Sequence, residues 1–335
     1  MRKVFPTLFV MGLFCASLVC RADSAPFGVA SAFNLVALGT ANAGGNTLLA
    51  GNIGTSADVE GRVAAANLVT VATTIGSTLG SDPYGSLADG YAVVAGGGIS
   101  ASNYFQINGG GNVYAPTNSA SYNWNENPKG SLISTGSSPV NFTSLRSTMD
   151  ALTLELAALT PSGVVGAPTP KGGNPSWLVL AGTSKTLNVF TVTAAQFAST
   201  NNPLDIEVPV GSTVIINVEG ANVTLGAGIY VNGQQEGDGN NDDADILFNF
   251  ADASTVSIDG QLDGAVLAPF AIFTSGSQVG GTIIAAQIGQ TGEVHNLEFE
   301  GTLPAQDEVP EPGTLSLMGI GLLFMGGLFL RRRSA

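Results

Sequence analysis

The amino-acid sequence predicts an all-β protein: a parallel β-solenoid, similar to a β-helix, with one flanking α-helix and a C-terminal transmembrane helix. Three observations support this prediction. A short phrase containing glycine and a β-branched residue recurs, short apolar segments alternate with turn residues, and one stripe of apolar residues has helical spacing. The chain of 335 residues, with 45 glycines and 11% charged residues, has room for one large β domain or two smaller ones.

The recurring phrase is Gly-x-Val/Ile-x-Ala. Two copies stand at 264–268 and 281–285, two earlier ones at 61–65 and 111–115, and a looser one at 91–95. Glycine marks a turn and the β-branched residue marks a short strand, so the phrase predicts one face of each coil of a solenoid. The irregular spacing predicts coils of unequal length. An ordinary Gly-rich β-sandwich remains the alternative.

Residues 1–22 are typical of a secretory signal peptide. Arg2-Lys3 precedes an apolar core over 4–19, and Cys20 and Ala22 form the small pair before a cleavage point after Ala22. Cleavage there leaves the mature protein without cysteine. Attachment of lipid at Cys20 is the alternative, and the bulky Val19 directly before it argues against this.

The first part of the body predicts strands and surface connections. An apolar run at 33–38 reads as a strand. Asp58 and Glu60 flank Val59, which suggests an acid/base pair, but the alternation of polar and apolar residues favours an exposed strand face. Residues 77–91 read as a surface connection, and 117–136 as a long exposed loop. Its Tyr122 and Trp124 are either ligand-binding aromatics or rings that pin the loop to the body.

One amphipathic α-helix is predicted after Asn141. Asn141 or Thr143 is available as its N-cap, and 161–163 supplies the stop. Because an isolated helix of this length is marginal in water, its stripe is expected to pack on the side of the solenoid. The stripe consists of Phe142, Leu145, Met149, Leu152 and Leu156.

Strands resume after a hinge-like loop at 166–175. Most have four to seven residues, with Gly, Asn, Asp or Pro between them, and this pattern argues for an all-β body. They are expected at 177–181, 187–193, 206–208, 213–218, 228–231, 246–250 and 255–258.

Charge is scarce and strongly skewed. From Asp23 to Pro312 the chain carries five basic and 25 acidic residues, a net charge of −20. Such a surface repels nucleic acid, so a DNA or RNA partner is not expected. The acidic loop at 236–245 places Asp238, Asn240 and Asp242 at alternate positions, as calcium ligands are placed. Because Asp243 and Asn249 stand where a calcium loop needs Gly and Glu, a solvated turn is favoured, and neither a metal nor another cofactor is expected.

Catalytic groups are few. His295 is the only histidine, with Glu293 and Glu298 near it in sequence, and no nucleophile motif is present. A structural histidine is therefore favoured over a hydrolytic group, and the protein is not expected to be an enzyme. Glycoside hydrolysis needs only two suitably spaced carboxylates, so a polysaccharide-active enzyme remains a third alternative.

The C-terminal segment has three parts after a linker at 303–308. The uncharged stretch 313–330 spans about 27 Å at about 1.5 Å per residue, close to the thickness of a bilayer core. The basic cluster behind it is expected to stay in the cytoplasm, which leaves the body outside. The parts are Val309, Pro310, Glu311 and Pro312; the transmembrane segment 313–330; and Arg331, Arg332 and Arg333.

This tail, residues 309–333, resembles the PEP-CTERM sorting signal of Gram-negative bacteria. The body at 27–302 resembles the choice-of-anchor A domain, an adhesive domain found with several surface anchors, although Phe248 stands where we expect Trp. The resemblance implies processing by an exosortase and carries over no catalytic residue. The matching body segments are 58–65, the single helix, 211–218, 247–250 and 267–269.

Together these features predict an exported bacterial surface or extracellular-matrix protein. We expect an adhesin or an exopolysaccharide-associated structural protein of a biofilm, which passes through an inner-membrane intermediate with its body outside to the cell surface or medium. Its expected partners are an exosortase and an exopolysaccharide or other surface ligand. An ice-binding-like β-helix is the alternative, although the sequence lacks a repeated Thr-x-Thr file.

Overall fold

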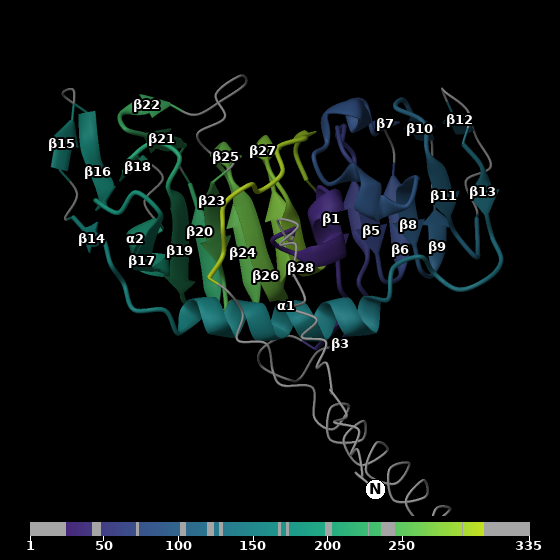
Figure 1. Ribbon diagram of the computed structural model, residues 1–335, viewed down its shortest axis with the longest axis horizontal. Helices are drawn as coiled ribbons and strands as arrows, with labels where there is room; N and C mark the ends of the chain where they lie inside the picture. Colours follow the sequence, from purple (N-terminus) through teal and green to yellow (C-terminus); the bar gives the residue numbers. More distant parts are fainter. Residues whose placement is uncertain are drawn as a thin grey trace, which may run out of the picture.

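The computed structural model describes a single elongated solenoid of short parallel strands (Figure 1). The described residues are 25–304, except 42–47, 72–73, 101–104, 119–123, 127–129, 167–168, 172–173, 198–202, 227, 236–244 and 290. Two stacks of coils build the solenoid, and α1 (Phe142–Ala157) runs along its length (Figure 1).

The first stack comes from the N-terminal half of the body. Its strands are β1 (Leu35–Ala37), β2 (Thr40–Ala41), β3 (Leu48–Leu49), β4 (Ile53–Thr55), β5 (Val63–Ala65), β6 (Leu68–Val71), β7 (Thr74–Ile75), β8 (Tyr91–Ala95), β9 (Gly98–Ser100), β10 (Phe105–Ile107), β11 (Asn112–Tyr114), β12 (Trp124–Glu126) and β13 (Leu132–Ile133). Its 3-10 helices are η1 (Gly28–Ala32), η2 (Leu79–Ser81) and η3 (Gly85–Ala88).

The second stack follows α1. Its strands are β14 (Val164–Val165), β15 (Thr169–Lys171), β16 (Asn174–Ala181), β17 (Leu187–Thr193), β18 (Leu204–Glu207), β19 (Thr213–Glu219), β20 (Asn222–Leu225), β21 (Ile229–Val231), β22 (Gln234–Gln235), β23 (Ile246–Asn249), β24 (Thr255–Ile258), β25 (Leu262–Asp263), β26 (Ala265–Ser275), β27 (Val279–Gly280), β28 (Ile283–Ile288) and β29 (Val294–His295). The short helix α2 spans Ala194–Phe197.

The chain begins in the middle of the solenoid. β1 pairs with β5 on one side and with β28, near the C-terminal end of the body, on the other. The first stack therefore grows outward from β1 to β13, α1 carries the chain back along the molecule, and the second stack returns from β17 to β28 (Figure 1). The two stacks share one 15-stranded sheet, so they form one continuous solenoid.

The recurring phrase marks one file of stacked strands, as predicted. Val63 is in register with Val93, and Val266 with Ile283. The glycine of the phrase lies at the corner before each strand. Gly281 has a φ of +137°, and a Cβ there would lie 2.4 Å from the carbonyl oxygen of Gly264 in the coil below, so this corner requires glycine.

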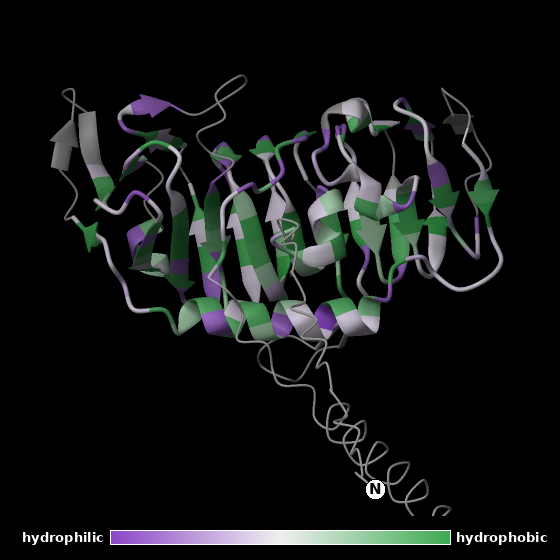
Figure 2. Cartoon of the chain, in the orientation of Figure 1, coloured by the Kyte–Doolittle hydropathy of each residue, from purple (hydrophilic) through white to green (hydrophobic). Residues whose placement is uncertain are grey.

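The core lies inside the coils and along the seam under α1. Alternate residues of each strand point inward, and most of these are Val, Ile, Leu or Phe with less than 6% of their surface exposed. The strands are accordingly hydrophobic along much of their length, whereas α1 alternates hydrophobic and hydrophilic residues (Figure 2). This alternation is what the sequence predicted for a helix with one buried stripe.

The predicted helix is confirmed with its cap. The side chain of Asn141 accepts a hydrogen bond from the backbone N–H of Ser144, and Leu145, Met149, Leu152 and Leu156 are buried. Sixteen residues give a length of about 24 Å, which matches about five strand spacings of about 4.8 Å. The helix therefore crosses several neighbouring strands of both stacks.

Buried asparagines attach the helix to the sheet. Asn217 donates to the carbonyl of Leu156 at 2.8 Å, and Asn249 donates to the carbonyl of Thr153 at 2.9 Å. The two asparagines are paired in register and also bond to each other at 2.8 Å. Thr153 and Leu156 are three residues apart in the helix, about 4.5 Å along its axis, which matches one strand spacing. Their two carbonyls therefore meet asparagines on two neighbouring strands.

Several sequence-based boundaries need correction. The predicted loop 117–136 contains β12 and β13, and the hinge-like loop 166–175 contains β15 and the start of β16. These strands were missed because pairing, rather than local propensity, holds them extended: β12, β13 and β16 stack on neighbouring coils, and β15 pairs antiparallel with β16. The connection 77–91 holds η2 and η3. The predicted transmembrane segment 313–330 lies outside the described residues, and within those residues no helix has the length and apolar character that a membrane crossing needs.

Candidate binding faces and a junction cluster

The face under α1, the covered face, presents apolar side chains outward. Val36, Ile284 and Leu267 lie in neighbouring strands and are fully buried against α1 and its surroundings. In the same file Ala64 and Val94 extend this surface into the first stack. Covering is required here, because an outward file of apolar residues would otherwise face water.

A second long face, the uncovered face, consists of β20, β24, the second half of β26, the end of β28, β4, β6 and β9. Its inward residues are apolar, as Val223, Val256 and Phe273 show. None of the described helices lies across it, and α2 packs against its edge strand β20. Its outward side chains are therefore candidates for contact with a ligand.

Small and hydroxyl-bearing residues form one outward file on this face. Thr224 pairs with Ser257 and Ser257 with Thr274 in the second stack. Gly54, Thr70 and Ser100 continue the file in the first stack, and Gly289 lies between Thr274 and Gly54. Neighbouring members lie one strand spacing apart, about 4.8 Å. The hydroxyl groups are thus regularly spaced at both ends of the file, with two glycines in its middle.

A parallel outward file carries longer polar groups. Asn222 and Thr255 are paired, and the Thr255 hydroxyl donates to the Asn222 side chain at 2.8 Å. Thr255 pairs with Ile272, and Ile272 with Gln287. No charged side chain stands at these outward positions. The uncovered face therefore offers uncharged donors and acceptors on a regular strand lattice.

The third face, built from β25, β27 and β29 in the second stack and from β7, β10 and β12 in the first, holds the only histidine of the chain. Val59 forms parallel bridges with Val294 and Ile75, so the two stacks also meet on this side. With Val59 and Val294 pointing inward, Glu60, Glu293 and His295 point outward, and their ligand atoms lie within 4.8 Å of one another. His295 Nδ1 is 3.5 Å from Glu60 Oε1. We name these three residues the junction cluster.

Glu298 lies near this cluster in sequence but in a different environment. It is only 5% exposed, and burial raises its pKa to about 7, against the opposing effect of Arg62. Arg62 forms an ion pair with Asp82, and burial lowers the pKa of Arg62. Glu298 is thus a buried carboxyl group at the corner beside the covered face.

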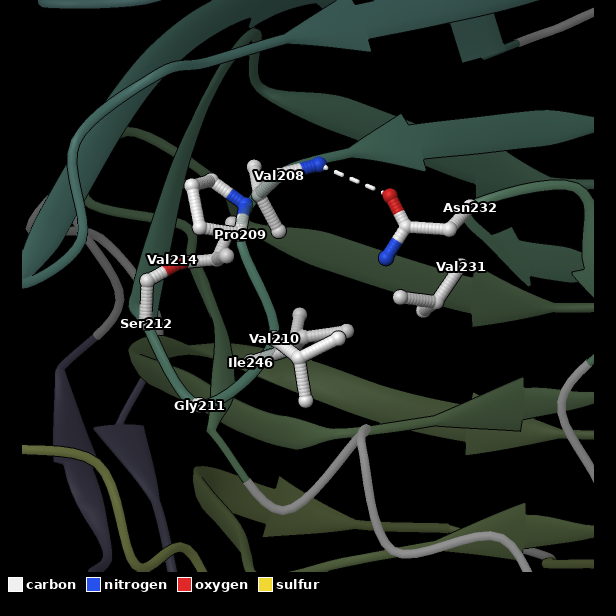
Figure 3. A pocket seen from close by; sticks show the side chains of 9 residues that line it. All are labelled: Val208, Pro209, Val210, Gly211, Ser212, Val214, Val231, Asn232 and Ile246. Atoms are coloured by element: carbon white, nitrogen blue, oxygen red, sulfur yellow. Dashed lines mark hydrogen bonds between the residues drawn. The ribbon is translucent and has the colours of Figure 1, made fainter.

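Two hollows in the described part of the chain are small or shallow. The pocket drawn in Figure 3 has a volume of about 10 Å³, enough for one water molecule, and Val208 N–H donates to Asn232 Oδ1 beside it. A shallow recess of about 500 Å³ opens beside Gln261, Gln278 and Glu293. The faces, rather than an enclosed pocket, are therefore the candidate binding surfaces.

Some of the sites predicted from the sequence lie outside the described residues, and the others lie within them. The sorting motif Val309 to Pro312, the cluster Arg331 to Arg333 and the calcium candidates Asp238, Asn240 and Asp242 lie outside the described residues, as does Tyr122. Trp124 lies in β12, in register with Phe105. Of the acids considered near His295, the structure brings Glu293 to it and not Glu298.

Sequence analysis missed two features. Glu60 was interpreted as part of a strand face and was not connected with His295, because parallel bridging between residues 59 and 294 has no local signal. The hydroxyl file was missed because its members come from six strands. The polar-apolar alternation in 222–225 and 255–258 was the available signal, but it does not give the register.

Comparison with solved structures finds the chain similar to ice-binding proteins. An ice-binding protein from the Antarctic ascomycete Antarctomyces psychrotrophicus is 10% identical, with 84% of this chain and 100% of that chain covered and a TM-score of 0.36. A domain of Shewanella frigidimarina ice-binding protein_1 is 16% identical, with coverages of 83% and 98% and a TM-score of 0.36. A glycosylated ice-binding protein from an Arctic yeast is 14% identical, with coverages of 86% and 98% and a TM-score of 0.30. No curated protein matches the chain.

Two family models match different parts of the chain. The PEP-CTERM protein-sorting motif matches residues 308–333, which confirms the resemblance of the tail. The model described as "Putative Ice-binding-like adhesive domain" matches residues 26–296, almost the whole body. The chain therefore belongs to the family of ice-binding-like adhesive domains and carries a PEP-CTERM sorting motif.

Proposed function

We propose that this protein is an exported adhesin or exopolysaccharide-associated structural protein, whose uncovered face binds its ligand. The observation that carries the proposal is the outward file of hydroxyl and small residues on a face that no described helix covers. The membership in an adhesive domain family and the sorting motif support it. The matched family is described as adhesive, and we propose no enzymatic activity.

The chemistry of the uncovered face suits a polyhydroxylated ligand. Thr70, Thr224 and Ser257 offer hydroxyl groups that both donate and accept, and Asn222 and Gln287 offer amides. No charged residue stands among these outward positions, so a polysaccharide can bind there without removing water from a charged side chain. Repeated weak contacts along seven strands add up through multivalency.

The tail determines delivery in this proposal. Residues 313–330 halt in the inner membrane with Arg331 to Arg333 inside, which places Pro310-Glu311-Pro312 at the outer interface for an exosortase. Replacing 310–312 by three alanines is expected to leave insertion intact and to abolish processing. Fractionation and intact mass in a bacterium with the matching exosortase measure this. A tail that is still removed, with the protein still reaching the surface, contradicts the sorting role.

Ordered water is the second candidate ligand, and a specific observation favours it. The hydroxyl groups of the file on the uncovered face repeat at the strand spacing, as a match to a regular layer of ordered water requires. The family is also described as ice-binding-like. Gly54 and Gly289 interrupt the hydroxyls in the middle of the file. We therefore rank this candidate second.

One pair of assays separates the two candidates. The purified protein is tested for pull-down on the exopolysaccharide of the producing bacterium and for thermal hysteresis in the same buffer. The adhesive proposal expects saturable pull-down without hysteresis. Hysteresis without pull-down supports ordered water instead, and the absence of both contradicts the proposal.

A further inference from the structure

We infer that Glu60, Glu293 and His295 form a binding site for one divalent metal ion of the zinc class, at the junction of the two stacks. The inference is independent of the proposed ligand on the uncovered face. The three side chains offer one imidazole nitrogen and two carboxylates within 4.8 Å of one another, and each is partly accessible to solvent. This donor set suits zinc, which takes His and Glu ligands in sites of three protein groups.

The spacing of two ligand atoms already fits. In a tetrahedral zinc site with bonds of about 2.0–2.1 Å, neighbouring ligand atoms lie about 3.4 Å apart. His295 Nδ1 and Glu60 Oε1 are 3.5 Å apart. Glu293 precedes His295 by two residues and so points to the same side of the chain. Its carboxylate lies within 4.8 Å of the other two ligand atoms and is partly buried, so it is placed to be the third ligand.

Neighbouring groups orient both carboxylates. The backbone N–H of Asn296 donates to Glu60 Oε2 at 3.0 Å, and Gln278 Nε2 donates to Glu293 Oε2 at 3.4 Å. In each carboxylate the protein thus holds Oε2, and in Glu60 the other oxygen, Oε1, is the atom that faces His295 Nδ1. Outer contacts of this kind fix the direction of metal ligands and strengthen binding.

A buried amide in the same corner lacks a partner. Asn34 is 0% exposed, and its Nδ2 donates to the carbonyl of His295 at 3.1 Å. Its Oδ1 has no hydrogen-bond partner among the described residues and occupies the space that a Cβ on Gly61, next to Glu60, would fill. The Asn296 Oδ1 atom lies beside the same point and also has no partner there, so two amide oxygens without a donor are buried next to Gly61. Unsatisfied buried acceptors are costly, and such a corner favours a positively charged neighbour.

The surroundings favour a cation and give it access. The segment from Asp23 to Pro312 has a net charge of −20, which raises the local concentration of cations. The recess beside Gln278 and Glu293 leads to the cluster from solvent. Because Glu60 belongs to the first stack and the other two ligands to the second, a bound ion ties the stacks together across the third face.

The test is a Zn²⁺ titration by calorimetry of the full chain in mild detergent, with Cys15→Ser and Cys20→Ser so that no thiol competes. The chain has a single histidine, so His295→Ala removes every imidazole ligand. We expect one zinc ion per chain. His295→Ala, Glu60→Gln and Glu293→Gln are each expected to weaken binding more than about tenfold, since even loss of an outer contact costs about 10–100-fold. Glu219→Gln, an exposed acid at the end of β19, is the matched control and should leave the affinity unchanged.

Two further readouts make the result decisive. Zinc should raise the melting temperature of the parent chain and not that of His295→Ala, and Co²⁺ should give a visible absorption spectrum only with the parent and the control. Each variant is melted first without metal, and His295→Gln replaces His295→Ala if alanine impairs folding. Unsaturable binding, or the parent's affinity in the histidine variant, overturns the site.

Discussion

The covered and uncovered faces are built from the same solenoid and differ in which side chains point outward. On the covered face Val36, Leu267 and Ile284 point outward and are fully buried. On the uncovered face Thr70, Thr224 and Ser257 stand at the outward positions and remain accessible. The strand β26 contributes to both faces, with apolar outward residues in its first half and Ile272 and Thr274 outward in its second.

The outward residues therefore decide where the helix packs. Apolar outward side chains gain free energy by burial, at about 25 cal/mol per Å², whereas hydroxyl groups gain little and remain hydrated. The asparagines Asn217 and Asn249 then fix the position of α1 on the apolar face. The face that the helix leaves open is free to serve binding.

The largest expected effect comes from breaking the covered face. Leu152→Ala removes a side chain that is 2% exposed under α1, so it should lower the free energy of unfolding by about 2–5 kcal/mol through lost burial and a cavity. Leu154→Ala, on the same helix but 54% exposed, is the control, with an expected change within about 0.5 kcal/mol. Urea unfolding measures both. If both variants lose the same free energy of unfolding, the apolar stripe does not hold the helix on the sheet.

The buried Glu298 should make the corner beside the covered face sensitive to pH. Its folded pKa is raised to about 7 from an ordinary value of 4.5, so the folded state holds the proton more tightly. Its contribution is complete below about pH 4.5 and is lost as pH rises through 7, by about 3 kcal/mol. Unfolding of the wild type and of Glu298→Gln is compared at pH 4.5 and pH 8. The variant should gain stability relative to the wild type at pH 8; a pH-independent difference would contradict the raised pKa.

Loss of an asparagine contact should lower the free energy of unfolding less than loss of a residue of the apolar stripe. Asn249→Ala removes the buried donor to Asn217 Oδ1 and to the Thr153 carbonyl, which should cost about 1–3 kcal/mol. Asn222→Ala removes an exposed asparagine of the uncovered face and serves as the matched control, with little expected change. Thermal unfolding compares the two. If Asn249→Ala unfolds at the same temperature as the wild type, the helix is held by apolar packing alone.

The smallest stability effects are expected on the uncovered face itself. Thr70→Ala and Thr224→Ala each remove an exposed hydroxyl group, so the free energy of unfolding should change by about 0.5 kcal/mol or less. Urea midpoints with unchanged slopes measure this. A loss above about 2 kcal/mol for either variant would show that these hydroxyl groups serve the fold rather than a ligand.

Much of the architecture could be predicted from the sequence. The Gly-x-Val/Ile-x-Ala phrase gave the stacked file, because only glycine fits corners such as Gly281. The stripe from Leu145 to Leu156 and the cap at Asn141 identified α1. Both signals are local: they depend on the period of the side chains and on backbone conformation within one coil.

The remaining features depend on contacts between distant residues. Nothing near β1 indicates that it inserts between β5 and β28, since the register of parallel coils follows from stacking and not from local propensity. For the same reason the sequence did not bring Glu60 to His295 or place Thr70 and Thr224 in one file. These pairings decide the candidate sites, so the sites were less predictable than the fold.

The central claim is that the uncovered face binds the ligand, and one comparison of bulky substitutions tests it most directly. Thr70→Trp and Thr224→Trp each place a large ring on the hydroxyl file, whereas Gln106→Trp places one on the third face. Binding of the three purified variants to the producer's exopolysaccharide is measured beside the wild type. We predict that both threonine variants lose binding and that Gln106→Trp retains it. Retained binding in both threonine variants, with loss in Gln106→Trp, would contradict the account.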